Sequence, residues 1–227
     1  MEMSKSAKMD IRFWKSPCWY FARKDLYESI VKNKHFIRGK ILDFGCGSKP
    51  YKELFAATEY IGLEHDCEQS RKNTKADFFY DGKHFPFDND SFDSIISTQV
   101  LEHVPNPIEV LNEMVRVLRQ GGYLMISVPF VQEEHETPYD FYRFSPYAIQ
   151  NMLNKTGLEI IEYKKLTCGV KAIISTITFY IYRTTRWKIA NLLSMFFNAF
   201  GIVLYKIFKK EGNIYINNFI IAQKGKK

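Results

Sequence analysis

The stretch Lys40-Ile41-Leu42-Asp43-Phe44-Gly45-Cys46-Gly47-Ser48-Lys49-Pro50 is the most informative part of this chain. It reads as an apolar strand that ends in a carboxylate, followed by a glycine turn and a helix entered through a proline. Glycines 45 and 47 permit a tight turn and let a ligand lie against main-chain atoms. The dinucleotide-binding motif G-x-G-x-x-G would need glycine where this chain has Pro50. The loop is therefore predicted to bind a nucleoside but not a pyrophosphate; the alternative is an ordinary strand-to-helix turn.

Further short apolar segments predict an α/β fold. Residues 60–64 form a second strand that ends in Glu64, about 20 residues after Asp43, and in doubly wound sheets an acid at that place accepts both ribose hydroxyls. A helix is expected from Pro107, with Asn106 as its cap and Gly121-Gly122 at its end. Other helices are expected over residues 14–34 and after Ser145-Pro146. The remaining strands are expected at residues 77–80, 94–97, 123–128, 158–163 and 218–222.

The order of these motifs closely resembles that of the class I S-adenosylmethionine-dependent methyltransferases, in the subgroup often labelled type 11. The resemblance covers roughly residues 36–165, and it depends on four segments in order: residues 42–47, 85–93, 100–104 and 116–122. Two positions depart from the family pattern, since Lys49 stands where a third glycine is frequent and Glu64 where aspartate is more frequent. Glutamate reaches one methylene further and can still span a diol, so nucleoside binding is expected to survive.

The resemblance implies a Rossmann-like, doubly wound, mostly parallel sheet of seven strands, with the last strand antiparallel between the fifth and the sixth. Between strands six and seven this chain has a long connection, which predicts a helical insertion. The expected division is an N-terminal helical cap (residues 1–35), an S-adenosylmethionine-binding core (36–165), a basic apolar insertion (166–212), and the last strand with its tail (213–227).

The resemblance also implies S-adenosylmethionine as cofactor and assigns its contacts residue by residue. The motif loop would hold the methionine part, the acid after the second strand the ribose, an Asp-Gly pair the adenine, and the end of the fourth strand the sulfonium side. The residues so assigned are Asp43, Gly45, Cys46, Gly47, Glu64, Asp81, Gly82, Thr98 and Gln99. Cys46 is expected to be a small residue beside the ligand rather than a nucleophile, because no histidine in the motif can ionise it.

An oxygen acceptor loses a proton as it attacks, so a base within hydrogen-bond reach is useful. His103 follows the fourth strand and His135 the fifth, both at the edge where such sheets bind ligands, and either could be the catalytic base or a structural residue. Tyr139 and Arg143 resemble an acceptor-facing segment, in which Arg143 would bind a phosphate or carboxylate. The alternative is a salt bridge from Arg143 to Asp140 that fixes the loop. No cluster shows metal-ligand spacing, so no metal is expected.

Bulk properties predict one intracellular domain. A chain of 227 residues with 46% hydrophobic content can bury a sufficient core. The polar first ten residues do not resemble a signal peptide. The four cysteines, at positions 18, 46, 67 and 168, show no C-x-x-C pairing, which favours a reduced, cytoplasmic protein.

The formal charge of +7 is unevenly distributed. Residues 163–210 contain nine basic residues and no acid, whereas residues 43–140 contain 18 acids and 8 lysines or arginines. An acidic mouth would repel phosphates, which argues against nucleic acid as partner. Residues 98–101 also lack the Asn/Asp-Pro-Pro-aromatic motif of DNA amino-methyltransferases.

The insertion holds two apolar runs, residues 172–182 and 189–205, and the second has 17 residues without a charge. That length is near the lower limit for crossing a bilayer. Its small and polar residues form one helical stripe: Asn191, Ser194, Asn198 and Gly201. We therefore expect a helical hairpin that lies on an anionic membrane surface; the alternative is packing on the same subunit or on a second copy in a homo-oligomer.

Together these features predict methyl transfer to a hydroxyl of a saccharide or lipid-linked glycan precursor, by a cytoplasmic enzyme that is peripheral on the inner membrane face. The alternatives are methylation of a quinone-like or other lipid, and a non-catalytic scaffold that binds the cofactor.

Overall fold

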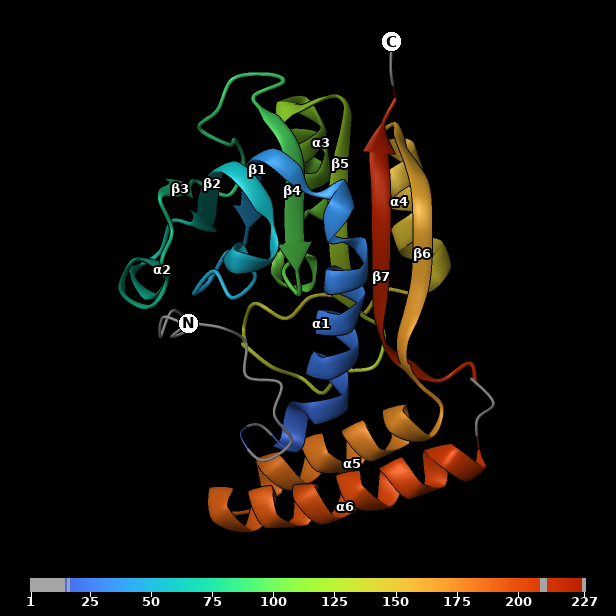
Figure 1. The fold of residues 1–227 in the computed structure, drawn as a ribbon. Coiled ribbons are helices and arrows are strands. Elements are labelled where there is room, and N and C mark those ends of the chain that lie inside the picture. Colours follow the sequence, from blue (N-terminus) through green and yellow to red (C-terminus); the bar gives the residue numbers. More distant parts are fainter. Residues whose placement is uncertain (1–14, 16, 209–211, 226–227) are drawn as a thin grey trace, which may run out of the picture.

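The computed structural model describes residues 15, 17–208 and 212–225. Its centre is a seven-stranded sheet with the order β3-β2-β1-β4-β5-β7-β6 (Figure 1). Strands β1 to β5 pair in parallel, and β7 is antiparallel to both β5 and β6. This confirms the expected Rossmann-like topology. The strands are β1 (Arg38–Phe44), β2 (Ala56–His65), β3 (Phe78–Tyr80), β4 (Phe92–Thr98), β5 (Leu118–Pro129), β6 (Leu158–Cys168) and β7 (Tyr215–Lys224).

Helices cover both faces of the sheet (Figure 1). Helix α1 packs on one face around Ile30, and α3 and α4 pack on the other around Leu111 and Ile149. The predicted helix at residues 14–34 is α1 preceded by a short 3₁₀ turn, and Trp14 lies outside the described residues. The helical elements are η1 (Pro17–Trp19), α1 (Tyr20–Asn33), η2 (Lys34–Phe36), η3 (Lys52–Leu54), α2 (Glu68–Asn73), η4 (Leu101–His103), α3 (Pro107–Val117), α4 (Pro146–Lys155), α5 (Val170–Thr184) and α6 (Trp187–Ile207).

The central strand β1 positions the motif loop. Its apolar residues are buried because β2 and β4 flank it and helices cover both faces, as parallel strands require. Leu42 pairs with Ile61 on one side and with Ile95 on the other. This register places Asp43 at the carboxyl edge of the sheet, directly before the glycine turn.

Three expectations about helix boundaries are wrong. No α-helix follows Pro50, because only five residues separate it from β2, and they form the 3₁₀ turn η3 with Tyr51 and Phe55 buried in the core. Helix α3 begins at Pro107 as expected but ends at Val117, and the side chain of Asn106 forms no cap hydrogen bond. Gly121 and Gly122 lie inside β5, where a Cβ on Gly122 would meet the carbonyl oxygen of Asp93 at 2.9 Å.

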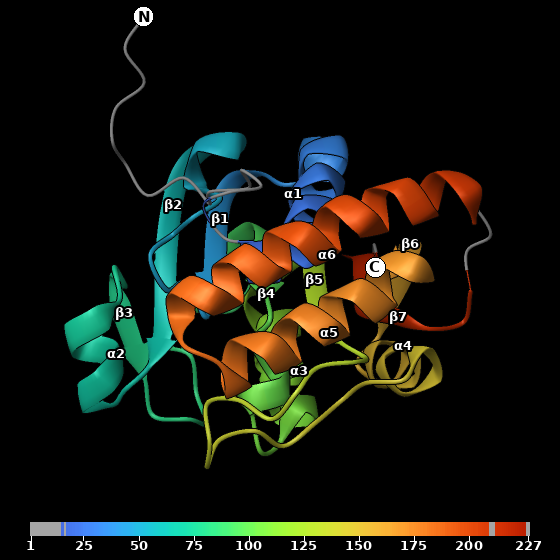
Figure 2. The same ribbon diagram turned by 90° about the horizontal axis from the view of Figure 1, so that it is seen from below.

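The insertion forms the expected helical hairpin, α5 and α6, which lies across the carboxyl edge of the sheet (Figures 1 and 2). The small and polar stripe of α6 faces the protein: Ser194, Asn198 and Gly201 are buried. Asn198 Nδ2 donates a 2.6 Å hydrogen bond to the carbonyl oxygen of Pro17. The apolar side of α6 consequently faces outward. Its exposed residues include Trp187, Ile189, Leu192, Phe196, Phe200, Val203 and Ile207.

Candidate active site

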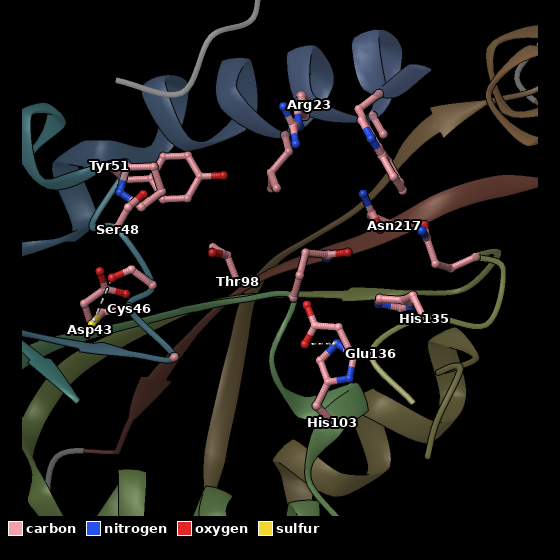
Figure 3. Close-up of a pocket in the computed structure, with 18 residues that line it drawn as sticks. Arg23, Asp43, Cys46, Ser48, Tyr51, Thr98, His103, His135, Glu136 and Asn217 are labelled. Atoms are coloured by element: carbon pink, nitrogen blue, oxygen red, sulfur yellow. Dashed lines mark hydrogen bonds and ion pairs between the residues drawn. The ribbon is translucent and has the colours of Figure 1, made fainter. Parts of the chain in front are cut away.

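A cavity of ≈ 590 Å³ opens at the carboxyl edge of the sheet, beneath α1 (Figure 3). Arg23 of α1 and Tyr51 lie over it, with the motif loop at one end and a pair of histidines at the other (Figure 3). It brings together eight of the residues expected from the sequence: Asp43, Gly45, Cys46, Gly47, Thr98, Gln99, His103 and His135.

The glycines of the motif loop have different physical roles. Both adopt positive φ, +70° at Gly45 and +48° at Gly47. A Cβ on Gly45 would lie 2.2 Å from Val100 Cγ2, so glycine there allows the loop to pack against the end of β4. A Cβ on Gly47 would meet nothing within 4 Å, so its main chain borders open space. The N–H of Gly47 donates a 2.7 Å hydrogen bond to Glu64 Oε1, which ties the loop to the end of β2.

Two carboxylates lie beside this loop: Asp43 is buried and lines the cavity, whereas Glu64 is half-buried and does not line it. Asp43 is buried and accepts a 2.7 Å hydrogen bond from the Tyr60 hydroxyl. Burial raises the pKa of Asp43 to about 7, although the hydrogen bond from Tyr60 acts in the opposite direction. Burial also raises the pKa of Glu64. A cationic ligand group beside them would favour their ionised forms, so this end of the cavity suits a positively charged ligand.

Cys46 is buried in the same loop. Burial, together with the neighbouring Asp43 and Glu64 carboxylates, raises the pKa of its thiol. The thiol therefore stays protonated at neutral pH and is a poor nucleophile, in agreement with a packing role beside the ligand.

Asp81 and Gly82 do not line the cavity. Asp81 Oδ1 accepts hydrogen bonds of 2.9 Å from the N–H groups of Lys83 and His84, so this carboxylate stabilises an exposed turn. Gly82 has a φ of +88° and lies against His65. Their expected contact with adenine stays a prediction.

The two histidines meet at the other end of the cavity. Their rings are perpendicular, with an interplanar angle of 84° and a centroid separation of 4.8 Å. His103 Nδ1 lies 2.7 Å from the carbonyl oxygen of Tyr139, and His135 Nδ1 lies 3.0 Å from that of Glu133. Because a carbonyl only accepts, each Nδ1 carries the hydrogen of that contact, which leaves Nε2 as the ring nitrogen with a lone pair. Either residue can therefore accept a proton.

Main-chain hydrogen bonds bring these histidines together. The N–H groups of Phe141 and Tyr142 donate to the carbonyl oxygen of Glu102, at 2.9 and 3.2 Å. They join the loop after β5 to η4, so residues that are far apart in the sequence share one end of the cavity.

Arg143 fixes this loop. Its guanidinium donates to the carbonyl oxygens of Gln132, Glu133 and Tyr142 and forms a bidentate pair with Asp140. All five N–H donors of an arginine are thereby used within the loop. The structure thus shows the salt-bridge alternative and leaves Arg143 no donor for an acceptor molecule. Tyr139 is 64% exposed and does not line the cavity; its carbonyl positions His103.

Several polar residues of the cavity were not expected from the sequence: Arg23, Tyr51, Gln132, Glu136 and Asn217. Asn217 is 3% exposed, and its Oδ1 has no hydrogen-bond partner among the described residues. The signal available in the sequence was the pair Asn217-Asn218 within an otherwise apolar stretch.

Comparisons with known proteins agree with this geometry. A family profile described as "Methyltransferase domain" matches residues 20–163. An uncharacterised methyltransferase of Mycobacterium leprae is 36% identical over 96 residues, which cover 38% of this chain and 36% of that protein. The match thus spans little more than a third of that relative. An uncharacterised protein of Methanocaldococcus jannaschii is 26% identical, covering 71% of this chain and 80% of that protein. A sterol 24-C-methyltransferase of Kluyveromyces lactis is 24% identical, covering 85% of this chain and 63% of that protein.

Solved structures share the fold. Phosphoethanolamine N-methyltransferase 2 of Haemonchus contortus, in complex with S-adenosylmethionine, gives a TM-score of 0.58 at 18% identity, covering 94% of this chain and 56% of that chain. The [4+2]-cyclase SpnF gives a TM-score of 0.58 at 18% identity, covering 89% of this chain and 82% of that chain. Likeness at these identities concerns the fold alone.

Proposed function

The chain belongs to the class I S-adenosylmethionine-dependent methyltransferases, and from this premise we propose that it methylates a hydroxyl of a saccharide or lipid-linked glycan precursor at the cytoplasmic face of a membrane. One observation carries the proposal: the cavity, with its polar histidine end, and the exposed apolar face of α6 lie at the same edge of the sheet. An acceptor with a polar head and a lipid anchor matches both surfaces.

The residues of the motif loop fit S-adenosylmethionine. The buried Asp43 carboxylate suits its ammonium group, Glu64 its ribose hydroxyls, and the open main chain at Gly47 gives it close access. When bound there, the cofactor supplies a methyl group activated by a sulfonium. Arg23 and Tyr51, which lie over the cavity, would shield this end from water.

The histidine end would bind the acceptor. His103 or His135 would receive the hydroxyl proton at Nε2, since each Nδ1 is committed to a carbonyl. Gln99, Gln132, Glu136 and Asn217 are polar groups of the kind that hydrogen-bond to sugar hydroxyls. Holding donor and acceptor close and in line can supply most of the rate of such a displacement.

The hairpin supports a membrane surface as the site of action. By length and composition, helix α6 could cross a membrane. Only 22% of its most apolar window is buried, so α6 differs from the core helix of a soluble protein, which would be mostly buried. Its polar stripe packs on the protein, which favours lying on the surface over crossing it. The basic residues Arg183, Arg186, Lys188 and Lys206 stand near the helix ends and complement anionic lipid. The four cysteines, all within the described residues, form no disulfide, which is compatible with a reducing compartment.

Calorimetry with S-adenosylmethionine and S-adenosylhomocysteine, followed by a labelled-methyl assay on cell fractions, tests this function. We expect both nucleosides to bind and the label to enter the membrane glycolipid fraction. Label confined to water-soluble products would contradict the membrane acceptor. Absence of binding at millimolar cofactor would contradict the whole proposal.

A second candidate acceptor is a quinone-like or other lipid without sugar, and the exposed apolar face of α6 favours it. Product mass distinguishes it from the glycan. Cofactor binding without methylated product in any fraction would instead identify a non-catalytic scaffold.

A further inference from the structure

Glu102 is a buried carboxylate without a hydrogen-bond partner. It is 0% exposed, and neither Oε1 nor Oε2 has a hydrogen-bond partner within the part of the chain that the structure describes. Buried charges in proteins are generally paired, hydrogen-bonded or bound to a metal, so an isolated carboxylate at this place calls for a compensating group.

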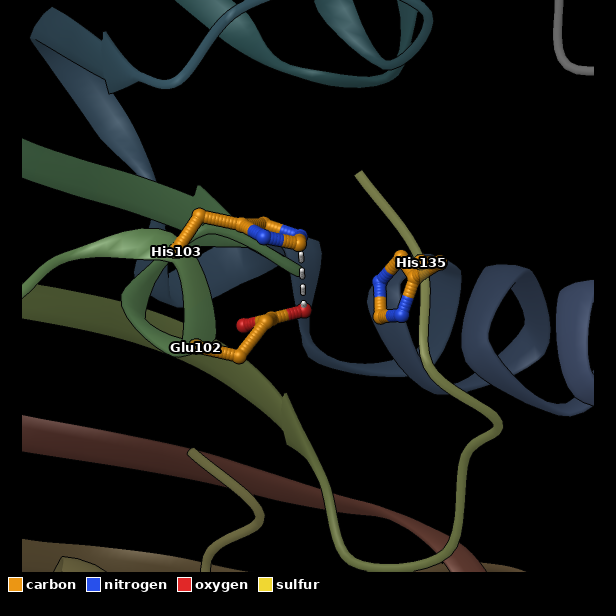
Figure 4. Close-up of side chains that lie close together, drawn as sticks. All are labelled: Glu102, His103 and His135. Atoms are coloured by element: carbon orange, nitrogen blue, oxygen red, sulfur yellow. Dashed lines mark ion pairs between the residues drawn. The ribbon is translucent and has the colours of Figure 1, made fainter. Parts of the chain in front are cut away.

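Two imidazoles lie beside this carboxylate. Ligand atoms of Glu102, His103 and His135 all lie within 4.8 Å of one another (Figure 4). Glu102 Oε1 is 4.0 Å from His103 Nε2. Ligands of a tetrahedral site are about 3.4 Å apart when each is about 2.1 Å from the ion. Small side-chain rotations would therefore complete the coordination geometry.

The surroundings of the histidines resemble those of metal ligands. In both rings Nδ1 lies beside a main-chain carbonyl, of Tyr139 for His103 and of Glu133 for His135. A carbonyl at this place fixes the tautomer and leaves Nε2 as the ligand atom, which is the usual outer-shell arrangement around metal-bound histidine.

Local charges also favour a cation. Glu136 Oε2 lies 3.8 Å from His103 Nε2 and adds a negative charge at the mouth of the cluster. Arg143 Nη2 lies 3.4 Å from His135 Nδ1, but its charge is compensated by the bidentate pair with Asp140.

We propose that Glu102, His103 and His135 bind a divalent transition-metal ion. Two imidazoles and one carboxylate suit Zn²⁺, Mn²⁺ or Fe²⁺ better than Mg²⁺ or Ca²⁺, which prefer all-oxygen sites. Three protein ligands leave coordination positions open, and His103 and His135 line the cavity. With the ion bound, Nε2 of both histidines would be occupied, so an acceptor oxygen in an open position would be activated by the ion in place of a histidine base. This consequence rests on the proposed function, whereas cation binding itself does not.

Sequence spacing does not reveal this cluster. Glu102 and His103 are adjacent and His135 lies in another loop, so the three residues meet only through the hydrogen bonds between η4 and the loop after β5.

Metal titration of the chelator-treated, tag-free full chain tests the site. Co²⁺ is followed by its visible absorption and Zn²⁺ by calorimetry. We expect one equivalent to bind, and we expect Glu102→Gln, His103→Gln and His135→Gln each to weaken binding by more than the about 10–100-fold that loss of an outer-shell partner costs. His84→Gln is the matched control, since His84 Nδ1 lies 4.0 Å from Glu113 Oε2 without being part of this cluster. Its affinity should equal that of the wild type.

Thermal unfolding of each variant shows that it is folded, and S-adenosylmethionine binding is measured on the same samples. Absence of metal uptake by the wild-type protein, or equal affinity in folded ligand variants, would overturn the site. Cofactor binding without metal uptake would overturn the metal site alone, and metal uptake without cofactor binding would overturn the proposed function alone.

Discussion

Asp43 and Glu102 are carboxyl groups that folding removes from water, and burial raises their pKa values to about 7 and about 8. At a pH between the ordinary pKa of each carboxyl group and its raised pKa in the folded protein, the folded state holds a proton that the unfolded state has released. The free energy of unfolding contributed by each group therefore falls as the pH rises through this window. Both groups are destabilising when ionised without a cation nearby.

Replacing Glu102 by glutamine should remove this loss of stability. In metal-free protein we expect Glu102→Gln to match the wild type near pH 5, where Glu102 is protonated, and to exceed its free energy of unfolding by roughly 2–4 kcal/mol near pH 9. Urea denaturation at several pH values measures the difference. The exposed loop variant Glu134→Gln should follow the wild type. Parallel pH profiles for the wild type and Glu102→Gln would contradict the argument.

Asp43→Asn should weaken S-adenosylmethionine binding without unfolding the protein. Asparagine can still accept the hydrogen bond from Tyr60, but it lacks the charge that attracts a cationic group. Hydrogen bonds to charged groups contribute about 1.5–3 kcal/mol, so we expect a loss of about 10–150-fold in affinity by calorimetry. Asp88→Asn, on an exposed turn, is the control. Unchanged affinity in Asp43→Asn would show that this carboxylate does not contact the cofactor.

The place of a site residue could be predicted from the sequence where the site is formed by consecutive residues. Asp43 and its glycines follow one another, so their shared place at the carboxyl edge follows from the strand that precedes them. Arg143 could not be assigned in the same way. Whether it contacts an acceptor depends on how many of its donors the folded loop uses, and the sequence does not contain that information.

At the scale of elements, the residue pattern predicts the α5–α6 hairpin but misplaces two helix boundaries. The period of Ser194, Asn198 and Gly201 correctly predicts one face of α6. In contrast, Pro50 and Gly121-Gly122 resemble helix boundaries, but a short connection and close packing against β4 determine their structure. Local propensity cannot represent these tertiary constraints.

The outward face of α6 should bind anionic vesicles. We expect the double variant Leu192→Ser/Phe196→Ser to lose most flotation with such vesicles, because these side chains are 69% and 65% exposed. Surface changes of this kind usually alter stability by no more than about 0.5 kcal/mol, so the fold should persist.

Phe78→Ser, an exposed aromatic on β3, is the control for that double variant. Wild-type flotation that survives the double substitution would exclude this face as the lipid contact. A wild-type dimer that the double variant converts to monomer in sedimentation velocity, without any flotation, would identify a second copy as the partner.

At the scale of the whole molecule, the cavity joins α1, the sheet edge and the loop after β5. A ligand that bridges these parts stabilises the folded chain as a unit. At a concentration of 100 times its dissociation constant, a ligand specific to the folded state adds about 2.7 kcal/mol. For a chain of 227 residues we expect S-adenosylhomocysteine to raise the melting temperature by roughly 5–10 °C.

Differential scanning calorimetry measures this shift, and adenosine alone is the comparison ligand. The same concentration should shift Asp43→Asn less than the wild type. A shift equal in both proteins would mean that the nucleoside binds without the motif loop.

The hairpin lies at the edge of the sheet where the cavity opens, with its apolar face turned outward. A catalyst held by that face would search for its acceptor by lateral diffusion in two dimensions. Its turnover would then follow the mole fraction of acceptor in the lipid, and diluting the acceptor with inert lipid would slow the reaction even at constant total concentration.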